Sequence, residues 1–148
     1  TGNLADSVNS GVAEGGGLSS TGTVSMRNTV VAANYDTPNN AGQGNIRADI
    51  SGAALSLGNN LLGNRNGSSG LVNGQNGDLV GTATQPLDPG LGPLADYGGV
   101  LAGHMPKVAS PLIDAGANDA VAAPLFDGPP FTDQRGEPFS RVVDGNGD

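Results

Sequence analysis

Residues 22–34 read GTVSMRNTVVAAN, and residues 52–64 read GAALSLGNNLLGN. Both stretches contain an alternating triplet, an Asn, an apolar pair and a closing Asn, which is Asn34 in the first and Asn64 in the second. Alternation predicts a β-strand, because successive side chains of a strand point to opposite faces. Asn tolerates the left-handed backbone conformation that a tight corner requires. Each stretch therefore predicts a strand, a corner, a short strand and a second corner.

The two stretches belong to a longer repeat. Asn3, Asn34 and Asn64 follow one another at intervals of 31 and 30 residues. A repeat of this length is typical of solenoids, in which each turn of the chain packs only on its neighbours. We therefore predict an all-β, right-handed parallel β-helix over residues 1–82. An α-helix is disfavoured because Gly and Asn interrupt every apolar stripe.

The composition favours the same architecture. The chain has 148 residues, of which 26 are Gly and only 3% are aromatic. A thin, repetitive stack of small aliphatic side chains needs fewer large aromatics than one thick core does. Charged residues make up only 14% of the chain, which is low for a disordered, solvated segment.

The charge excludes several classes of partner. The net charge is −8, whereas nucleic acids and anionic lipids are bound by basic surfaces. There is no Cys, which excludes a zinc ribbon, a thiol nucleophile and a disulfide scaffold. No apolar run approaches the roughly 20 residues of a membrane span. We expect no nucleic-acid partner, no membrane insertion by this segment, and an extracellular setting.

The second half of the chain has a different character. Nine of the ten prolines lie between Pro86 and Pro138, and Pro removes a donor from the ladder of a regular strand. Residues 83–148 are therefore predicted to form an irregular, Pro-rich C-terminal end piece that caps the same domain. Because the chain opens at Thr1 and stops at Asp148 within a motif, we expect a truncated piece of a longer protein.

Four ordered motifs of this half resemble those of a known family. Residues 86–99, PLDPGLGPLADYGG, are similar to the DP-x-LGPL-x-x-x-GG signature of the choice-of-anchor Q domain. The stretches SPLIDAG (residues 110–116), DQRG (133–136) and RVVDGNGD (141–148) resemble its later motifs. The family comprises bacterial surface proteins with parallel β-helix repeats, related to the polymorphic outer-membrane repeats. The resemblance implies an exported, surface-associated solenoid and no defined activity.

The last residues suggest a metal site. Asp144, Asn146 and Asp148 offer oxygen ligands at alternate positions, as in the first half of an EF-type calcium loop. The intervening Gly residues let the backbone curl so that the three side chains converge. Calcium takes six to eight oxygens, so further ligands would come from other segments. The alternative is a solvated, acidic chain end.

A second group combines opposite charges. Asp133, Arg135 and Arg141 are predicted to form a charge cluster, because the Arg fork pairs bidentately with a carboxylate. Such a cluster would either recognise a sugar carboxylate or pin the end piece against the solenoid by a structural salt bridge, and the second interpretation is favoured. Asp114 is expected to cap a turn through its side chain.

Catalytic residues are not evident from the pattern. His104 is the single histidine, and neither a partner Ser nor a G-x-S-x-G elbow accompanies it. The acidic and basic residues of the first half are dispersed, without a carboxylate pair at repeat spacing: Asp6, Glu14, Asp36, Asp49 and Asp78, with Arg27, Arg47 and Arg65. An enzymatic role of this segment is therefore disfavoured.

These features lead to one functional hypothesis and one alternative. The hypothesis is an exported bacterial cell-surface structural or adhesive β-helix module, which presents a surface for a glycan, for another cell or for self-association. The alternative is the non-catalytic C-terminal end of a β-helix carbohydrate-active enzyme, either a polysaccharide lyase or a hydrolase. Both place the chain outside the cell or at its surface, with calcium as the one candidate cofactor.

Overall fold

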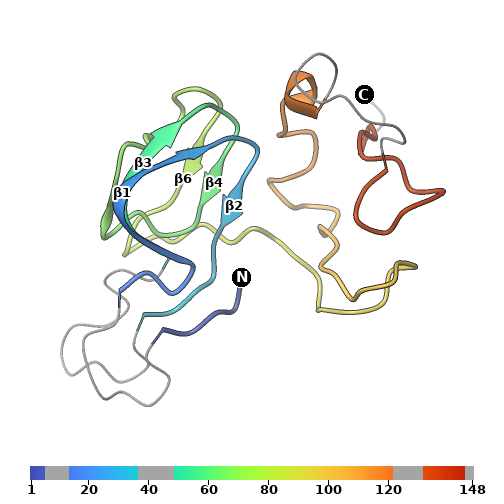
Figure 1. The fold of residues 1–148 in the computed structure, drawn as a ribbon, viewed down its shortest axis with the longest axis horizontal. Helices are drawn as coiled ribbons and strands as arrows, with labels where there is room; N and C mark the ends of the chain where they lie inside the picture. Colours follow the sequence, from blue (N-terminus) through green and yellow to red (C-terminus); the bar gives the residue numbers. More distant parts are fainter. Residues whose placement is uncertain (6–13, 37–48, 122–131, 146–148) are drawn as a thin grey trace. The chain divides into compact units, whose positions relative to one another are not determined.

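A computed structural model describes residues 1–5, 14–36, 49–121 and 132–145 of the chain. Two of the three predicted calcium ligands, Asn146 and Asp148, lie outside the described residues, as do Asp6 and Arg47. Short strands and turns connected by irregular chain make up the described part (Figure 1). The strands are β1 (Leu18–Met26), β2 (Val30–Val31), β3 (Ile50–Ser56), β4 (Leu61–Leu62), β5 (Ser68–Ser69) and β6 (Leu79–Val80).

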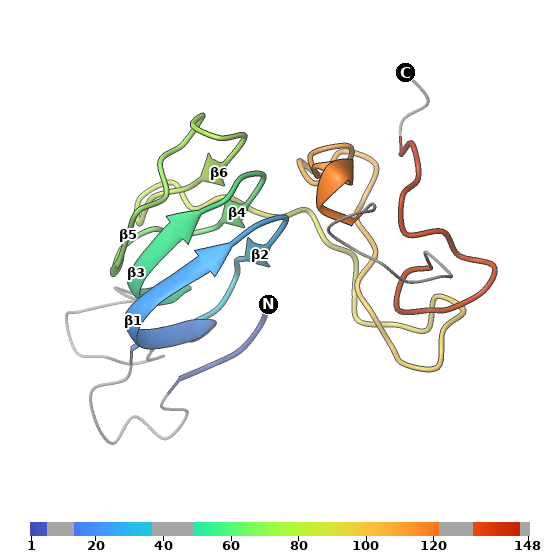
Figure 2. The ribbon, with the colours of Figure 1, turned by 45° about the horizontal axis from the view of Figure 1, so that its top comes forward.

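The strands form two parallel sheets of three strands each, ordered β1-β3-β5 and β2-β4-β6 (Figures 1 and 2). In the first sheet Val24 pairs with Ala54. In the second sheet Leu62 pairs with Val31 on one side and with Val80 on the other. Residues 30 or 31 positions apart thus become neighbours in the first two segments. The step from Leu62 to Val80 is only 18 positions.

The predicted right-handed parallel β-helix over residues 1–82 is wrong. The described residues form two small parallel sheets and no closed solenoid. Four of the six strands contain only two residues, and the interval between paired segments falls from 31 to 18 residues. Outside the two sheets, the only strand pairing among the described residues of the first half is the isolated bridge between Leu4 and Tyr35. The repeat is too short and too uneven for its turns to close.

The hydrophobic core lies in the sheet region and is small. Met26, Ile50 and Ala54 come from the first sheet, and Leu62 and Val80 come from the second. Leu71 completes this buried cluster, against which Leu18, Val24 and Val31 pack in part. The core contains no aromatic side chain, in keeping with the aliphatic composition. Burial of such side chains stabilises the fold by about 1.5–3 kcal/mol each.

Gly52 sets the register of the first sheet. Ser19 pairs with Ser51 and Thr23 pairs with Ala53, so the pairing shifts between these two positions. At Gly52, φ is 129°, and a Cβ there would lie 2.3 Å from the carbonyl oxygen of Ser20. Only glycine therefore allows β3 to follow β1 through this irregularity.

A hydrogen-bond motif that we call the asparagine clamp occurs three times among the described residues of the first half. In each clamp the backbone N and the side-chain Nδ2 of one Asn both donate to a single oxygen. Asn3 clamps Oδ1 of Asn34 at 3.2 and 2.9 Å. Asn34 clamps Oδ1 of Asp49 at 3.0 and 2.8 Å, and Asn60 clamps Oδ1 of Asp78 at 3.0 Å for both bonds. The clamps link segments 15 to 31 residues apart.

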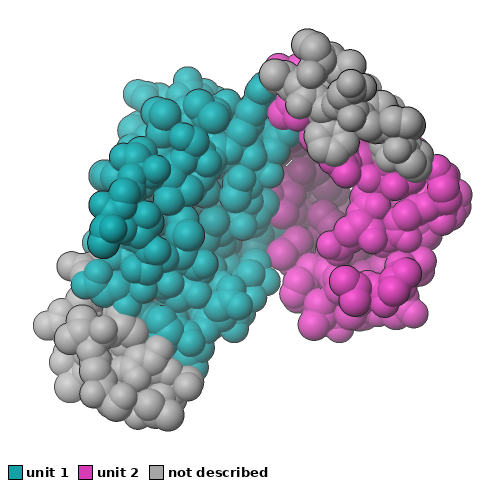
Figure 3. Space-filling view, viewed as in Figure 1, with its two compact units in different colours: residues 1–89 teal, residues 90–148 magenta. Residues whose placement is uncertain are grey.

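The chain divides into two compact units, Thr1–Pro89 (unit 1) and Gly90–Asp148 (unit 2), shown in Figure 3. Residues 83–89 thus belong with the sheets, although the sequence placed the boundary after residue 82. Leu87 N donates to the carbonyl oxygen of Gly63 at 2.8 Å, which ties this segment to unit 1. The described residues of unit 2 form turns, isolated bridges and one 3₁₀ turn, Asn118–Val121. Among the described residues, no helix has the length and hydropathy needed to cross a membrane.

Candidate functional site

The candidate site lies in unit 2 and is built from two segments. The first, residues 90–107, folds back on itself as an antiparallel loop. Ala95 and Gly103 exchange two backbone hydrogen bonds of 3.0 and 2.9 Å, and Gly92 N donates to Met105 O at 2.8 Å. The loop carries Tyr97, and it places His104 and Met105 on the returning strand-like segment.

The second segment, residues 132–140, is a tight turn closed by the bridge between Thr132 and Ser140. Inside it, Arg135 is held by Asp133. Nε of Arg135 lies 2.9 Å from Oδ2 of Asp133, and Nη2 lies 2.6 Å from the same oxygen. The guanidinium also lies 3.8 Å above the centre of the Phe139 ring. The side-chain hydrogen bonds between the two residues, aided by their opposite charges, lower the pKa of Asp133 and raise that of Arg135.

The two segments meet through a close backbone approach. A Cβ at Gly99 would lie 2.9 Å from Cα and from Cγ of Arg135, so any larger residue would push the loop away from the turn. Nη1 of Arg135 reaches the carbonyl oxygen of Tyr97 at 3.5 Å. The two glycines of residues 98–99 therefore allow the loop to lie against the DQRG turn.

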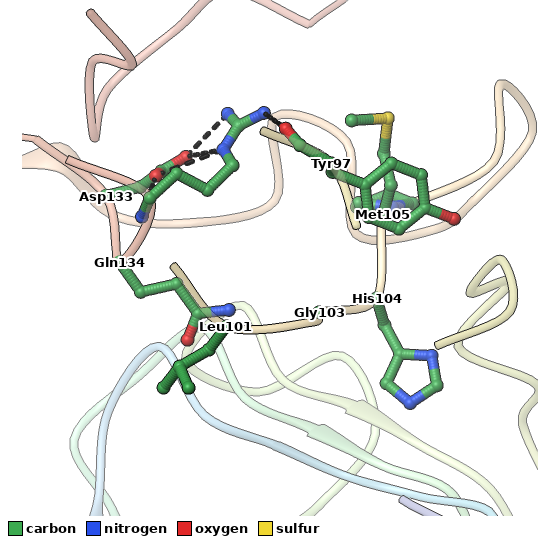
Figure 4. A pocket seen from close by; sticks show the side chains of 9 residues that line it. Tyr97, Leu101, Gly103, His104, Met105, Asp133 and Gln134 are labelled. Atoms are coloured by element: carbon green, nitrogen blue, oxygen red, sulfur yellow. Dashed lines mark hydrogen bonds and ion pairs between the residues drawn. The ribbon is translucent and has the colours of Figure 1, made fainter. Parts of the chain in front are cut away.

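A cavity of about 240 Å³ opens between the loop and the turn (Figure 4). In Figure 4, Tyr97 and Met105 lie on one side of this opening and Leu101 and Gln134 on the other. The Asp133–Arg135 pair forms a further wall of the same opening. The complete lining comprises Tyr97, Leu101, Gly103, His104, Met105, Pro106, Asp133, Gln134 and Arg135.

The polar groups of the cavity differ in how many hydrogen bonds they already make within the protein. The Arg135 fork is taken up by Asp133, and Tyr97 Oη donates to Pro93 O at 3.1 Å. His104 Nδ1 lies 2.8 Å from Gly92 O, which leaves Nε2 as the second ring nitrogen. In the part of the chain that is described, the exposed side-chain amide of Gln134 has no hydrogen-bond partner.

The predicted charge cluster is present in part. Asp133 and Arg135 form the expected bidentate pair, while Arg141 Nε donates to the carbonyl oxygen of Thr132 at 3.1 Å. The salt bridge fixes a turn within unit 2. The interpretation as a sugar-carboxylate site is not favoured, because the guanidinium that would bind the carboxylate already has one.

A second hollow of about 550 Å³ lies beside the predicted calcium ligand Asp144, which is exposed. Asp114 and Arg141 also line this hollow. Oδ1 of Asp114 accepts a hydrogen bond from Gly145 N at 3.0 Å. Asp114 therefore ties a distant segment to its own loop, in addition to occupying a turn with φ of 54°. Within the described ranges, no group of three metal-ligating side chains comes together, and calcium binding stays a prediction.

The dispersed carboxylates of the first half have a role that the sequence did not indicate. Asp36, Asp49 and Asp78 are at most 2% exposed. Both oxygens of Asp49 accept hydrogen bonds, Oδ1 from Asn34 and Oδ2 from Asn64 N at 2.7 Å. Loss of solvent nevertheless raises the pKa of Asp49. The signal that could have found Asp49 and Asp78 is their position directly before a strand, at residues 50 and 79.

Comparisons with protein-family models, with curated proteins and with solved structures found no match to this chain. The resemblance to the choice-of-anchor Q domain therefore stays a prediction that rests on the four motifs quoted above.

Proposed function

We propose that this chain is a structural and adhesive module of an exported bacterial surface protein, in which unit 2 contacts the partner. The observation that carries the proposal is the distribution of apolar side chains in unit 2. Among the described residues of unit 2, five large apolar side chains are between 64% and 98% exposed: Leu94, Val100, Leu101, Val108 and Val143. Four of the five lie between residues 94 and 108, and exposed apolar side chains that come close together are typical of interaction surfaces.

Unit 1 is suited to the supporting part of such a module. Its buried carboxylates are enclosed and hydrogen-bonded, as Asp49 and Asp78 show. Carboxylates in this state cannot reach a polysaccharide as acid and base. Their hydrogen bonds instead connect segments distant in sequence, which makes the unit a scaffold.

A binding and turnover experiment tests the proposal. The full chain is incubated with insoluble bacterial cell walls and with neutral and acidic polysaccharides, and both retention and newly formed reducing or unsaturated ends are measured. We expect retention without new ends. The double variant Val100→Ser, Val108→Ser should weaken retention, whereas the exposed Leu57→Ser change in unit 1 should not.

Two results would contradict the proposal. Release of sugar products by the chain would favour the alternative, a carbohydrate-active enzyme. If the unit 2 double variant is retained as well as the unmodified chain, the loop does not take part in the contact.

Self-association is a second form of the same function, and strand β1 supports it. This nine-residue strand is the terminal strand of its sheet among the described residues, with exposed Thr23 and Ser25. An edge strand presents backbone donors and acceptors to a further strand. Sedimentation over a concentration series should detect association, and Thr23→Lys should suppress it. A strict monomer at every concentration would leave adhesion without self-association.

A further inference from the structure

We propose that the cavity between residues 97–106 and the 133–135 turn binds one neutral sugar ring of a glycan. The inference deepens the proposed function, because it names the class of ligand that unit 2 would contact. It concerns the cavity, which shares Leu101 with the exposed apolar side chains of unit 2 and does not include Val100 or Val108.

The size of the cavity limits the ligand. Drug-sized molecules occupy cavities of roughly 300–1,000 Å³, and this cavity measures about 240 Å³. It is therefore suited to a single ring of a small polar molecule and not to an extended aromatic cofactor. An opening between two loops also lets the neighbouring rings of a polymer remain outside.

The charge of the lining selects a neutral ligand. Arg135 is the one basic side chain of the lining apart from His104, and Asp133 holds its guanidinium by the 2.6 and 2.9 Å contacts described above. A carboxylate or phosphate on the ligand would have to compete with Asp133 for the same nitrogen atoms. The net charge of −8 opposes an anion further.

The remaining groups match the chemistry of a sugar ring. One side of a pyranose is apolar and would lie against Tyr97, Met105 and Leu101. Its hydroxyl groups both donate and accept hydrogen bonds. Gln134 offers an amide with both functions, and His104 offers Nε2 (Figure 4). The amide is placed beside the loop, because Nε2 of Gln134 would lie 2.9 Å from a Cβ at Gly103.

Ligand-observed NMR on the full chain tests this assignment. The probes are glucose, galactose, mannose and N-acetylglucosamine, with glucuronate as the charged counterpart. We expect weak, saturable binding of at least one neutral sugar and weaker binding of glucuronate. Gln134→Leu should reduce the affinity about fivefold to tenfold, since it removes hydrogen bonds to the ligand but keeps the size of the side chain.

Two further variants complete the experiment. Tyr97→Leu should reduce the affinity more than Gln134→Leu, because the flat ring surface is lost. Gln85→Leu, an exposed change in unit 1, is the matched control and should leave binding unchanged. One-dimensional spectra of each variant establish that unit 2 remains folded.

The outcomes separate this inference from the proposed function. Three results would overturn the sugar assignment: tighter binding of glucuronate than of the neutral sugars, no binding of any neutral sugar, or Gln134→Leu and Tyr97→Leu variants that bind sugar as tightly as the unmodified chain does. If the chain is still retained on cell walls when one of these results is found, the proposed adhesive function remains supported. Loss of retention in the Val100→Ser, Val108→Ser variant with intact sugar binding would show that the apolar contact surface and the sugar cavity act separately.

Discussion

The two units of this chain satisfy their polar groups in opposite ways. Unit 1 encloses them: the clamp between Asn60 and Asp78 is buried and joins residues 18 positions apart. Unit 2 keeps them near the surface: Asp133 and Arg135 are two positions apart, with side chains about a quarter to a third exposed. Unit 1 therefore depends on long-range contacts for its stability, whereas the turns of unit 2 are fixed locally. Mutations should separate the two cases.

The largest effect is expected at Gly52. Gly52→Ala introduces a Cβ 2.3 Å from Ser20 O at a φ of 129°, and we expect it to lower the free energy of unfolding by about 3 kcal/mol or more. Urea unfolding of the purified chain measures this change.

Gly74→Ala is the matched control, because Gly74 also has a positive φ, 79°, but no atom lies within 4 Å of the added Cβ. It should cost about 1–2 kcal/mol from the backbone conformation alone. Equal losses in the two variants would mean that the contact between β1 and β3 does not require glycine.

The next effect concerns the asparagine clamp. Asn60→Ala removes the Nδ2 bonds to Asp78 Oδ1 and to Met26 O, and it deprives Thr29 N of its acceptor. We expect a loss of about 1–3 kcal/mol, because buried polar groups remain without partners. The exposed Asn66→Ala should change stability by less than about 0.5 kcal/mol. A neutral Asn60→Ala variant would contradict a structural role of the clamp.

The pH dependence should have opposite signs in the two units. The pKa of Asp133 is lowered below 3.8 by Arg135. The ionised carboxylate therefore makes its full contribution to the free energy of unfolding above pH 3.8, and this contribution is lost as the pH falls through the lowered pKa. The pKa of Asp49 is raised above 3.8 by burial, so its ionised form opposes folding above that raised pKa. Protonation of Asp49 relieves this opposition as the pH falls toward 3.8.

Unfolding free energies at several pH values check this contrast. The unmodified chain should be more stable than the Asp133→Asn variant near neutral pH, and this difference in the free energy of unfolding should shrink in acid. Relative to Asp49→Asn, the unmodified chain should gain stability over the same range. Parallel curves for the unmodified chain and both variants would show that neither carboxylate has a shifted pKa.

Calcium should give the smallest effect. If Asp144 contributes to a site, calcium equal to its dissociation constant stabilises the chain by about 0.4 kcal/mol. Thermal unfolding should then shift upward with calcium, return with a chelator, and respond less in Asp144→Asn. No shift in a chain extended beyond Asp148 would end the prediction.

The local pattern of the sequence located the strands but not the architecture. Alternation around Val24 and Ala54 and the apolar pairs at Val31 and Leu62 were placed correctly, and these residues do pair in parallel. The extent of each strand depends on neighbours elsewhere in the chain, and the shortened step to Val80 follows from a tight turn. The pattern could not reveal that the chain would stop short of a closed solenoid.

The site could be predicted only as separate fragments. The pair of Asp133 and Arg135 follows from their spacing and chemistry. The contact of Gly99 with Arg135 joins residues 36 positions apart, and no local pattern contains that information. The cavity and the free amide of Gln134 therefore emerge only when the loop and the turn are placed together.

The clamp also bears on how the molecule ages chemically. Conversion of a clamping Asn to Asp would replace a donor with a second carboxylate facing the first. Side-chain amides hydrolyse most readily before glycine, and the buried Asn34 and Asn60 precede Tyr35 and Leu61 instead. Among the described residues, the exposed Asn66, Asn73 and Asn76 do precede glycine, and Oδ1 of Asn73 accepts a hydrogen bond from Val80 N of β6 at 2.9 Å. Chemical damage should thus accumulate first at these exposed residues and spare the buried clamps.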